Sequence, residues 1–186
     1  MRARRLAATL AVTTLALSTL TSLAAAPGPA AAHERLDSDH PAHVKHDLEK
    51  ARKATARFTD EREAVKAGYK HTDMCVSSTE GGMGYHYVKD AYIGSTDPAK
   101  PAVLVYVPGK DGKRQLGALE YVVLDRDKNV NTDDDRPRMF GRGFDGPMPG
   151  HAPEMPVHYD LHVWLYKHNP DGLLATFNPD VHCPAS

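Results

Sequence analysis

Residues 102–124, AVLVYVPGKDGKRQLGALEYVVL, decide the fold of this chain. Two runs rich in β-branched and aromatic residues, AVLVYV at 102–107 and LGALEYVVL at 116–124, lie on either side of the polar segment PGKDGK at 108–113. Residues of the first kind favour β-strands, whereas Pro, Gly and Asp favour a turn between them. The sequence therefore predicts a β-hairpin, which is the strongest structural signal in the chain.

Two helices are predicted before this hairpin. Apolar or small residues recur at spacings of four, three, four and three residues, which places them on one face of an amphipathic helix. These residues are Val44, Leu48, Ala51, Thr55 and Phe58. Asp60 is positioned to cap a second, short helix, with Glu63 three residues on, and Gly68 is positioned to end it. Residues 44–68 therefore predict a helical hairpin or a bent helix.

Further strands are predicted from shorter runs. Residues 85–88, YHYV, resemble a strand, and YDLHVWLY at 159–166 predicts another, with a helix as the competing interpretation of the second run. Residues 125–157 form a long connection that is rich first in Asp and Asn and then in Gly and Pro. Together these features predict an α+β fold, in which an N-terminal helical pair packs on a small, mainly antiparallel sheet. Barrel-like closure of that sheet is an alternative.

The N-terminus has the pattern of an export signal. Three arginines within the first five residues precede an uncharged apolar run at 6–26, and the small residues at 30–32 suit a signal peptidase. We therefore predict a signal peptide over residues 1–32 and a secreted protein, with a membrane anchor as the competing interpretation. The polar, His-rich residues 33–43 are predicted to form a flexible arm, and residues 44–186 a single globular domain.

Composition limits the classes of function and partner. Lys and Arg number 23 against 24 Asp and Glu, so there is no basic excess for binding nucleic acid, and we expect no membrane partner once the signal is removed. The chain has no G-x-S-x-G or P-loop motif, which argues against serine-hydrolase and nucleotide chemistry. Its two cysteines, Cys75 and Cys183, are predicted to form a disulfide because exported proteins meet an oxidising environment, with a reactive thiol as the alternative.

Two ionisable residues stand inside apolar or aromatic runs. Glu120 lies within LGALEYVVL, where a carboxylate is costly to bury unless a cation, a metal or hydrogen bonds meet it. The alternative is a glutamate on an edge strand that faces water or an arginine. His86 follows the glycine-rich residues 81–84, which would let the backbone approach a ligand closely.

The segment HYDLHVW at 158–164 carries two further histidines. On a strand, one face carries the side chains of His158, Asp160, His162 and Trp164. Two of these that lie two residues apart could bind one ion, with Asp160 as a ligand or as the partner of a ligand. His158 and His162 would then lie about 13 Å apart, too far for one ion, whereas a helix would bring both imidazoles together. A hydrogen-bonded polar face is the alternative interpretation.

These residues together predict a divalent-metal site. Its predicted ligands are His86, Glu120, His158 and His162. Asp160 or His151 is a further candidate, and zinc or copper suits imidazole best. If one coordination position stays open, the site would support metal-assisted hydrolysis or oxidation, with Glu120 or Asp160 as the base.

A non-catalytic function is the alternative from a different class. The protein would then be an envelope or secreted protein without enzymatic activity. It would bind a small molecule in an aromatic pocket lined by Tyr85, Tyr87 and Trp164.

Two weaker metal signals lie elsewhere in the chain. Residues 125–133 imitate the oxygen spacing of a calcium-binding EF-hand loop, but Val130 stands where Gly is needed and Arg136 where a bidentate Glu should fall. A solvated acidic loop is therefore the preferred interpretation. If signal cleavage leaves His33 first, its amine and imidazole could chelate copper together, and a loose His-rich tail is the alternative.

Several short motifs also form a recognisable set. They are GMGYHY at 82–87, LEY at 119–121, FDGPM at 144–148, HYDLHVW at 158–164 and NPxVxC at 178–183. From about Ala54 onward, the chain with this set of motifs resembles a group of small exported proteins that are common in actinobacteria. The resemblance implies an exported protein, but it implies no activity and no catalytic residue.

Overall fold

The structure is a computed structural model that describes residues 41–109, 111–150 and 155–184. The predicted signal peptide and residues 33–40 of the predicted arm lie outside the described residues. Within the described residues, no helix is both long enough and apolar enough to span a bilayer.

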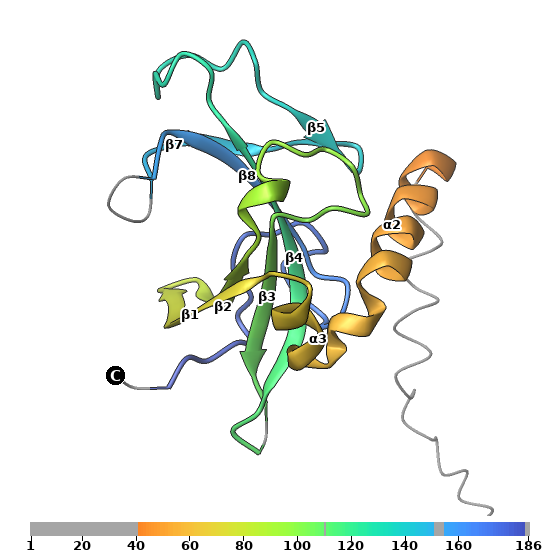
Figure 1. Ribbon diagram of the computed structural model, residues 1–186. Coiled ribbons are helices and arrows are strands. Elements are labelled where there is room, and N and C mark those ends of the chain that lie inside the picture. The colour runs from red at the N-terminus through yellow and green to blue at the C-terminus, as the bar shows by residue number, and fades with distance from the viewer. Residues whose placement is uncertain (1–40, 110, 151–154, 185–186) are drawn as a thin grey trace, which may run out of the picture.

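One antiparallel sheet of six strands forms the centre of the fold, in the order β1-β2-β3-β4-β8-β7 (Figure 1). The strands in that order are β1 (Lys70–Ser78), β2 (Gly81–Val88), β3 (Val103–Pro108), β4 (Arg114–Leu124), β8 (His158–Val163) and β7 (Asp145–Met148). A separate short pair joins β5 (Arg138–Met139) to β6 (Arg142–Gly143). The sheet curls into half a barrel, with β1 and β7 as its edges. The predicted hairpin is confirmed as β3-β4, and β8 confirms a strand where a helix was the competing interpretation.

The predicted helical pair is also confirmed. It consists of α2 (Ala42–Thr55), the 3-10 turn η1 (Ala56–Thr59) and α3 (Glu61–Lys66). Every residue of the predicted apolar stripe is buried. Asp60 caps α3 by accepting a hydrogen bond from the backbone N–H of Arg62 at 3.0 Å, and Gly68 follows the helix with a φ of 90°. Because α2 begins at Ala42, His43 of the predicted arm lies in this helix.

The two faces of the sheet carry different apolar clusters. On the helix face, α2 and η1 pack against buried residues of the central strands, among them Leu104, Tyr106 and Leu119. On the opposite face, which we call the tail face, the buried apolar residues are Ala102, Val103, Val105, Val107, Ala118, Val122, Trp164 and Val181. The β3–β4 register shifts at Gly117, so Leu116 joins the helix face although Ala118 lies on the tail face.

The C-terminal segment packs on the tail face and is tied to the first two strands. The predicted disulfide between Cys75 and Cys183 is present, with a Cα–Cα distance of 5.7 Å. Gly82 and Asn178 exchange two backbone hydrogen bonds of 3.1 and 3.0 Å. A Cβ on Gly82 would lie only 2.6 Å from Val181 Cγ1. Gly82 of the glycine-rich run therefore admits the chain's own C-terminal segment.

Leu48→Ala should lower the free energy of unfolding by about 2–5 kcal/mol, because Leu48 is buried between α2 and the helix face of the sheet. Val65→Ala is the control, since Val65 on α3 is 50% exposed and its truncation should change that free energy by less than about 0.5 kcal/mol. Urea unfolding followed by circular dichroism measures both variants. Equal losses would contradict the packing of α2 on the sheet.

Candidate metal centre

Three ionisable side chains from three strands meet on the tail face: His86 of β2, Glu120 of β4 and His162 of β8. Glu120 and His162 are direct partners in the β4–β8 register, so their side chains stand next to each other. His86 lies two strands away from Glu120, about 10 Å across the sheet. The intervening strand β3 presents Val103 and Val105 on this face, and these short side chains leave room for the imidazole and the carboxylate to meet above them.

The side-chain atoms of these residues lie close together in a buried place. Nε2 of His86 is 3.4 Å from Oε2 of Glu120, and Nε2 of His162 is 3.8 Å from the same oxygen. The His162 side chain is 0% exposed, that of Glu120 8% and that of His86 16%. One ligand atom from each residue lies within 4.8 Å of the other two, and no other group of His, Cys, Asp or Glu in the described ranges has this spacing. The predicted convergence is confirmed for these three residues.

This spacing fits a small metal ion. A tetrahedral zinc with bonds of about 2.0–2.1 Å to nitrogen holds its ligand atoms roughly 3.3 Å apart. The separations of 3.4 and 3.8 Å approach that value, and small rotations of the side chains would close the difference. His86, Glu120 and His162 therefore lie close enough to hold a metal ion.

Buried negative charge extends from this group along the sheet. Burial raises the pKa of Glu120 well above its ordinary value, and the charge of Asp160 raises it further. The pKa of Asp160 is itself raised to about 7, first by burial and then by Asp145, while Arg142 lowers it. Asp145 forms an ion pair with Arg142, and Oδ1 of Asp160 lies 3.9 Å from Nδ1 of His162. The centre is thus rich in carboxylates that lack full compensation by cations.

His158 lies outside the group, which corrects the predicted set of four ligands. It lies on the same face of β8 as His162, but four residues earlier, which amounts to about 13 Å along a strand. Its partner in the register is Leu124 and not Glu120. Nδ1 of His158 lies 3.1 Å from the backbone oxygen of Pro156. Because the segment is a strand, its two histidines cannot serve one ion.

The predicted aromatic pocket is not formed, because its three rings lie on opposite faces of the sheet. Tyr87 is buried on the helix face and Tyr85 packs beside it, whereas Trp164 belongs to the tail face. The guanidinium carbon of Arg114 lies 3.9 Å from the centre of the Tyr85 ring. The indole N–H of Trp164 donates to a backbone carbonyl at 2.7 Å. Side-chain alternation along β2 also places both tyrosines opposite His86.

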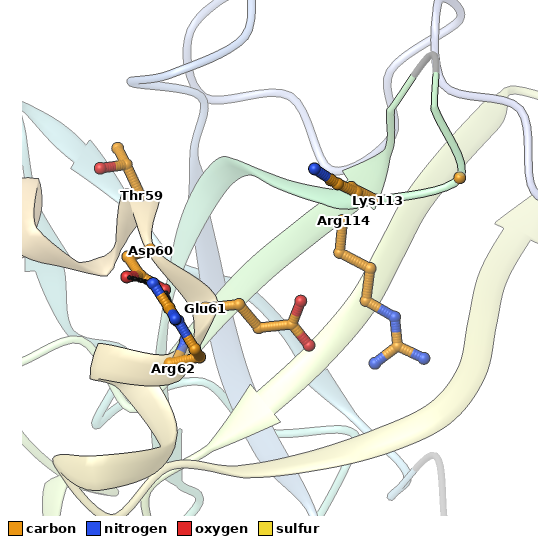
Figure 2. Close-up of a pocket in the computed structure, with 7 residues that line it drawn as sticks. Thr59, Asp60, Glu61, Arg62, Lys113 and Arg114 are labelled. Carbon is orange, nitrogen blue, oxygen red and sulfur yellow. Dashed lines mark hydrogen bonds and ion pairs between the residues drawn. The ribbon is translucent and has the colours of Figure 1, made fainter.

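A hollow of about 790 Å³ lies between α3 and the β3–β4 turn (Figure 2). Its lining residues are Thr59, Asp60, Glu61, Arg62, Gly112, Lys113 and Arg114. Most of its charges meet a partner: Arg62 pairs with Asp60 at 2.7 Å, and the Tyr87 hydroxyl donates to Glu61 and accepts from Arg114. No local pattern marks this cluster, because residues 59–62, Tyr87 and residues 112–114 lie far apart in the sequence.

The remaining metal predictions concern loops and the N-terminus. In the loop after β4, Asp127 accepts hydrogen bonds from the backbone N–H of Asn129 at 2.9 Å and from the hydroxyl of Thr132 at 2.8 Å. The loop therefore uses these oxygens to build its own turns, in keeping with the preferred interpretation of a solvated acidic loop. His33 and His151 lie outside the described residues.

The chain matches no protein-family model, and comparisons with curated proteins and with solved structures give no match. The resemblance to small exported actinobacterial proteins stays a prediction. Only the residues and their geometry therefore bear on the function.

Glu120→Gln should remove a pH-dependent loss of stability from the metal-free protein. Because the pKa of Glu120 is raised in the folded state, the folded chain holds this proton more tightly than the unfolded chain. The wild type therefore loses stability as the pH rises above 4.5, the ordinary pKa of this group. Glutamine does not ionise, so the variant should gain stability relative to the wild type between about pH 5 and pH 7, by at most about 1.4 kcal/mol per pH unit.

Urea unfolding in the presence of a chelator, repeated at each pH, measures this difference. Asp127→Asn is the control, because Asp127 lies in an exposed loop. A stability difference between Glu120→Gln and the wild type that stays constant with pH would show that burial of Glu120 carries no cost.

Proposed function

We propose that this protein binds one divalent transition-metal ion, Zn²⁺ or Cu²⁺, through His86, Glu120 and His162. The observation that carries the proposal is the approach of three ligand atoms, from three separate strands, to within 4.8 Å of one another in a largely buried place. Two imidazoles and a carboxylate are a donor set that zinc accepts as three protein ligands with an open fourth position. Imidazole also suits copper.

The charge balance around the site supports a divalent cation. When ionised, Glu120, Asp160 and Asp145 supply three negative charges. Arg142 pairs with Asp145, while Glu120 and Asp160 face the imidazoles of His86 and His162, which are cations only when protonated. With neutral imidazoles, a divalent ion would balance the charges of Glu120 and Asp160. In the metal-free chain, burial and mutual repulsion instead favour protonation, as the raised pKa values of Glu120 and Asp160 indicate.

Asp160 would act on the metal through His162. Its carboxylate faces Nδ1, while Nε2 of the same ring faces Glu120. A carboxylate at the far nitrogen fixes the ring orientation and the tautomer of a metal-bound histidine, which leaves the lone pair of Nε2 for the ion. Of the two roles predicted for Asp160, this is the role of partner to a ligand.

Because the three ligands are largely buried, the site is better suited to binding an ion than to acting on a large substrate. His86 is the most exposed of the three, and its side chain is only 16% exposed. As a ligand, Glu120 would not be available as the base, so Asp160 is the stronger of the two predicted bases. Metal-assisted hydrolysis or oxidation of a small molecule is a second candidate function, because three protein ligands leave a fourth position open.

We also propose that the protein works outside the cytosol. The disulfide between Cys75 and Cys183 is a bond that persists in oxidising compartments. Residues 1–32 have the pattern of a cleavable export signal. Both features support secretion of the folded domain.

The chain, stripped with a chelator and dialysed, should bind one Zn²⁺ per molecule in isothermal titration calorimetry and elemental analysis. His86→Ala should weaken binding by more than about 100-fold, because it removes a ligand and not only the partner of a ligand. His71→Ala is the matched control, since His71 lies on the neighbouring strand β1 with its side chain 48% exposed and outside the ligand group.

Repeating the titration with Cu²⁺ distinguishes the two metals. Failure of the wild type to bind either ion would overturn the proposal. So would binding by His86→Ala that is as tight as binding by the wild type and by His71→Ala.

A further inference from the structure

We propose that residues 178–183, NPDVHC, act as a strap that retains the metal ion, which enters and leaves the site when the strap lifts from the tail face. This inference rests on the proposed metal binding and concerns the regulation of that site. It assigns the C-terminal segment a function in metal exchange, in addition to its packing on the sheet.

The strap packs on the face of the sheet that carries the ligands. Val181 is 3% exposed and belongs to the tail-face cluster together with Val103 and Val105. Val103 is the cross-strand partner of Glu120, and Val105 is the cross-strand partner of His86. Removal of Val181 would therefore open part of the apolar cluster on the face that carries the ligands.

Several bonds hold the strap on β2 and β1. Asn178 is fully buried, exchanges two backbone hydrogen bonds with Gly82, and donates from its side-chain amide to a backbone carbonyl at 2.9 Å. Val181 lies so close to Gly82 that no Cβ fits between them. Cys183 is bonded to Cys75 of β1. The strap is therefore attached to the sheet at both of its ends.

This double attachment distinguishes the strap from an ordinary chain terminus. Terminal residues of most domains fray, because few contacts hold them and the end of the chain is free. Here the disulfide ties Cys183 to β1, so the strap can lift only as a short loop between Asn178 and Cys183. Exchange of the ion then depends on the free energy of this local opening and not on global unfolding.

The test measures how fast the Zn²⁺-loaded protein gives up its ion to an excess of a colour-forming chelator. Val181→Ala keeps the ligands and the disulfide, and should release Zn²⁺ about tenfold faster, because the loss of two methyl groups weakens the contact of the strap with the sheet. The double variant Cys75→Ser/Cys183→Ser should also release Zn²⁺ faster than the wild type. Val130→Ala truncates a valine that is 44% exposed in the loop after β4, and should release at the wild-type rate.

The number of ions bound per chain separates the two proposals. If the wild type binds no Zn²⁺, the proposed metal binding fails and the strap fails with it. If Val181→Ala binds one ion but releases it at the same rate as Val130→Ala, the strap proposal fails and metal binding stands. The comparison of these two valine variants decides the matter even if the double serine variant does not fold, because both keep the disulfide.

Discussion

The buried carboxylate of Glu120 is the constraint on which the rest of the structure depends. It stands on a central strand, 6% exposed, on a sheet face that is otherwise largely apolar. A charge in such a place costs several kcal/mol unless it is neutralised or paired. The strand order provides partners for this carboxylate. It places β8 next to β4, so that His162 lies opposite Glu120, and His86 of β2 approaches Glu120 across β3 from the other side. The fold thus gathers its titratable groups at one point.

The two faces of the sheet differ in content: the helix face forms the main core, and the tail face carries the candidate ligands. The helix α2 packs beside the sheet (Figure 1). The main core consists of the large buried side chains of the helix face. The tail face combines a smaller cluster of Val, Ala and Trp side chains with the three candidate ligands, and the C-terminal strap packs on it. Local opening of the strap would expose the smaller cluster and leave the helix-face core closed. Movement at the site is therefore compatible with a stable domain.

Placing the ligands on strands has a further consequence. His86, Glu120 and His162 come from three strands that are far apart in the sequence, so the group exists only in the folded chain. Binding of an ion would therefore favour the folded state. Strands also hold side chains more rigidly than loops do, which suits a site that must keep three ligand atoms at fixed separations.

The sequence by itself determined the local features: the buried stripe of α2, the β3-β4 hairpin, the pairing of the only two cysteines, and the need of Glu120 for a polar partner. These follow from periodicity and from the cost of burial, which are properties of short segments. Only the tertiary structure decided that the register of β4 with β8 selects His162 and excludes His158, and that Gly81 and Gly82 receive the C-terminal strap. The physical reason is that strand register and strand order depend on contacts between residues tens of positions apart, and such contacts leave no trace in local patterns.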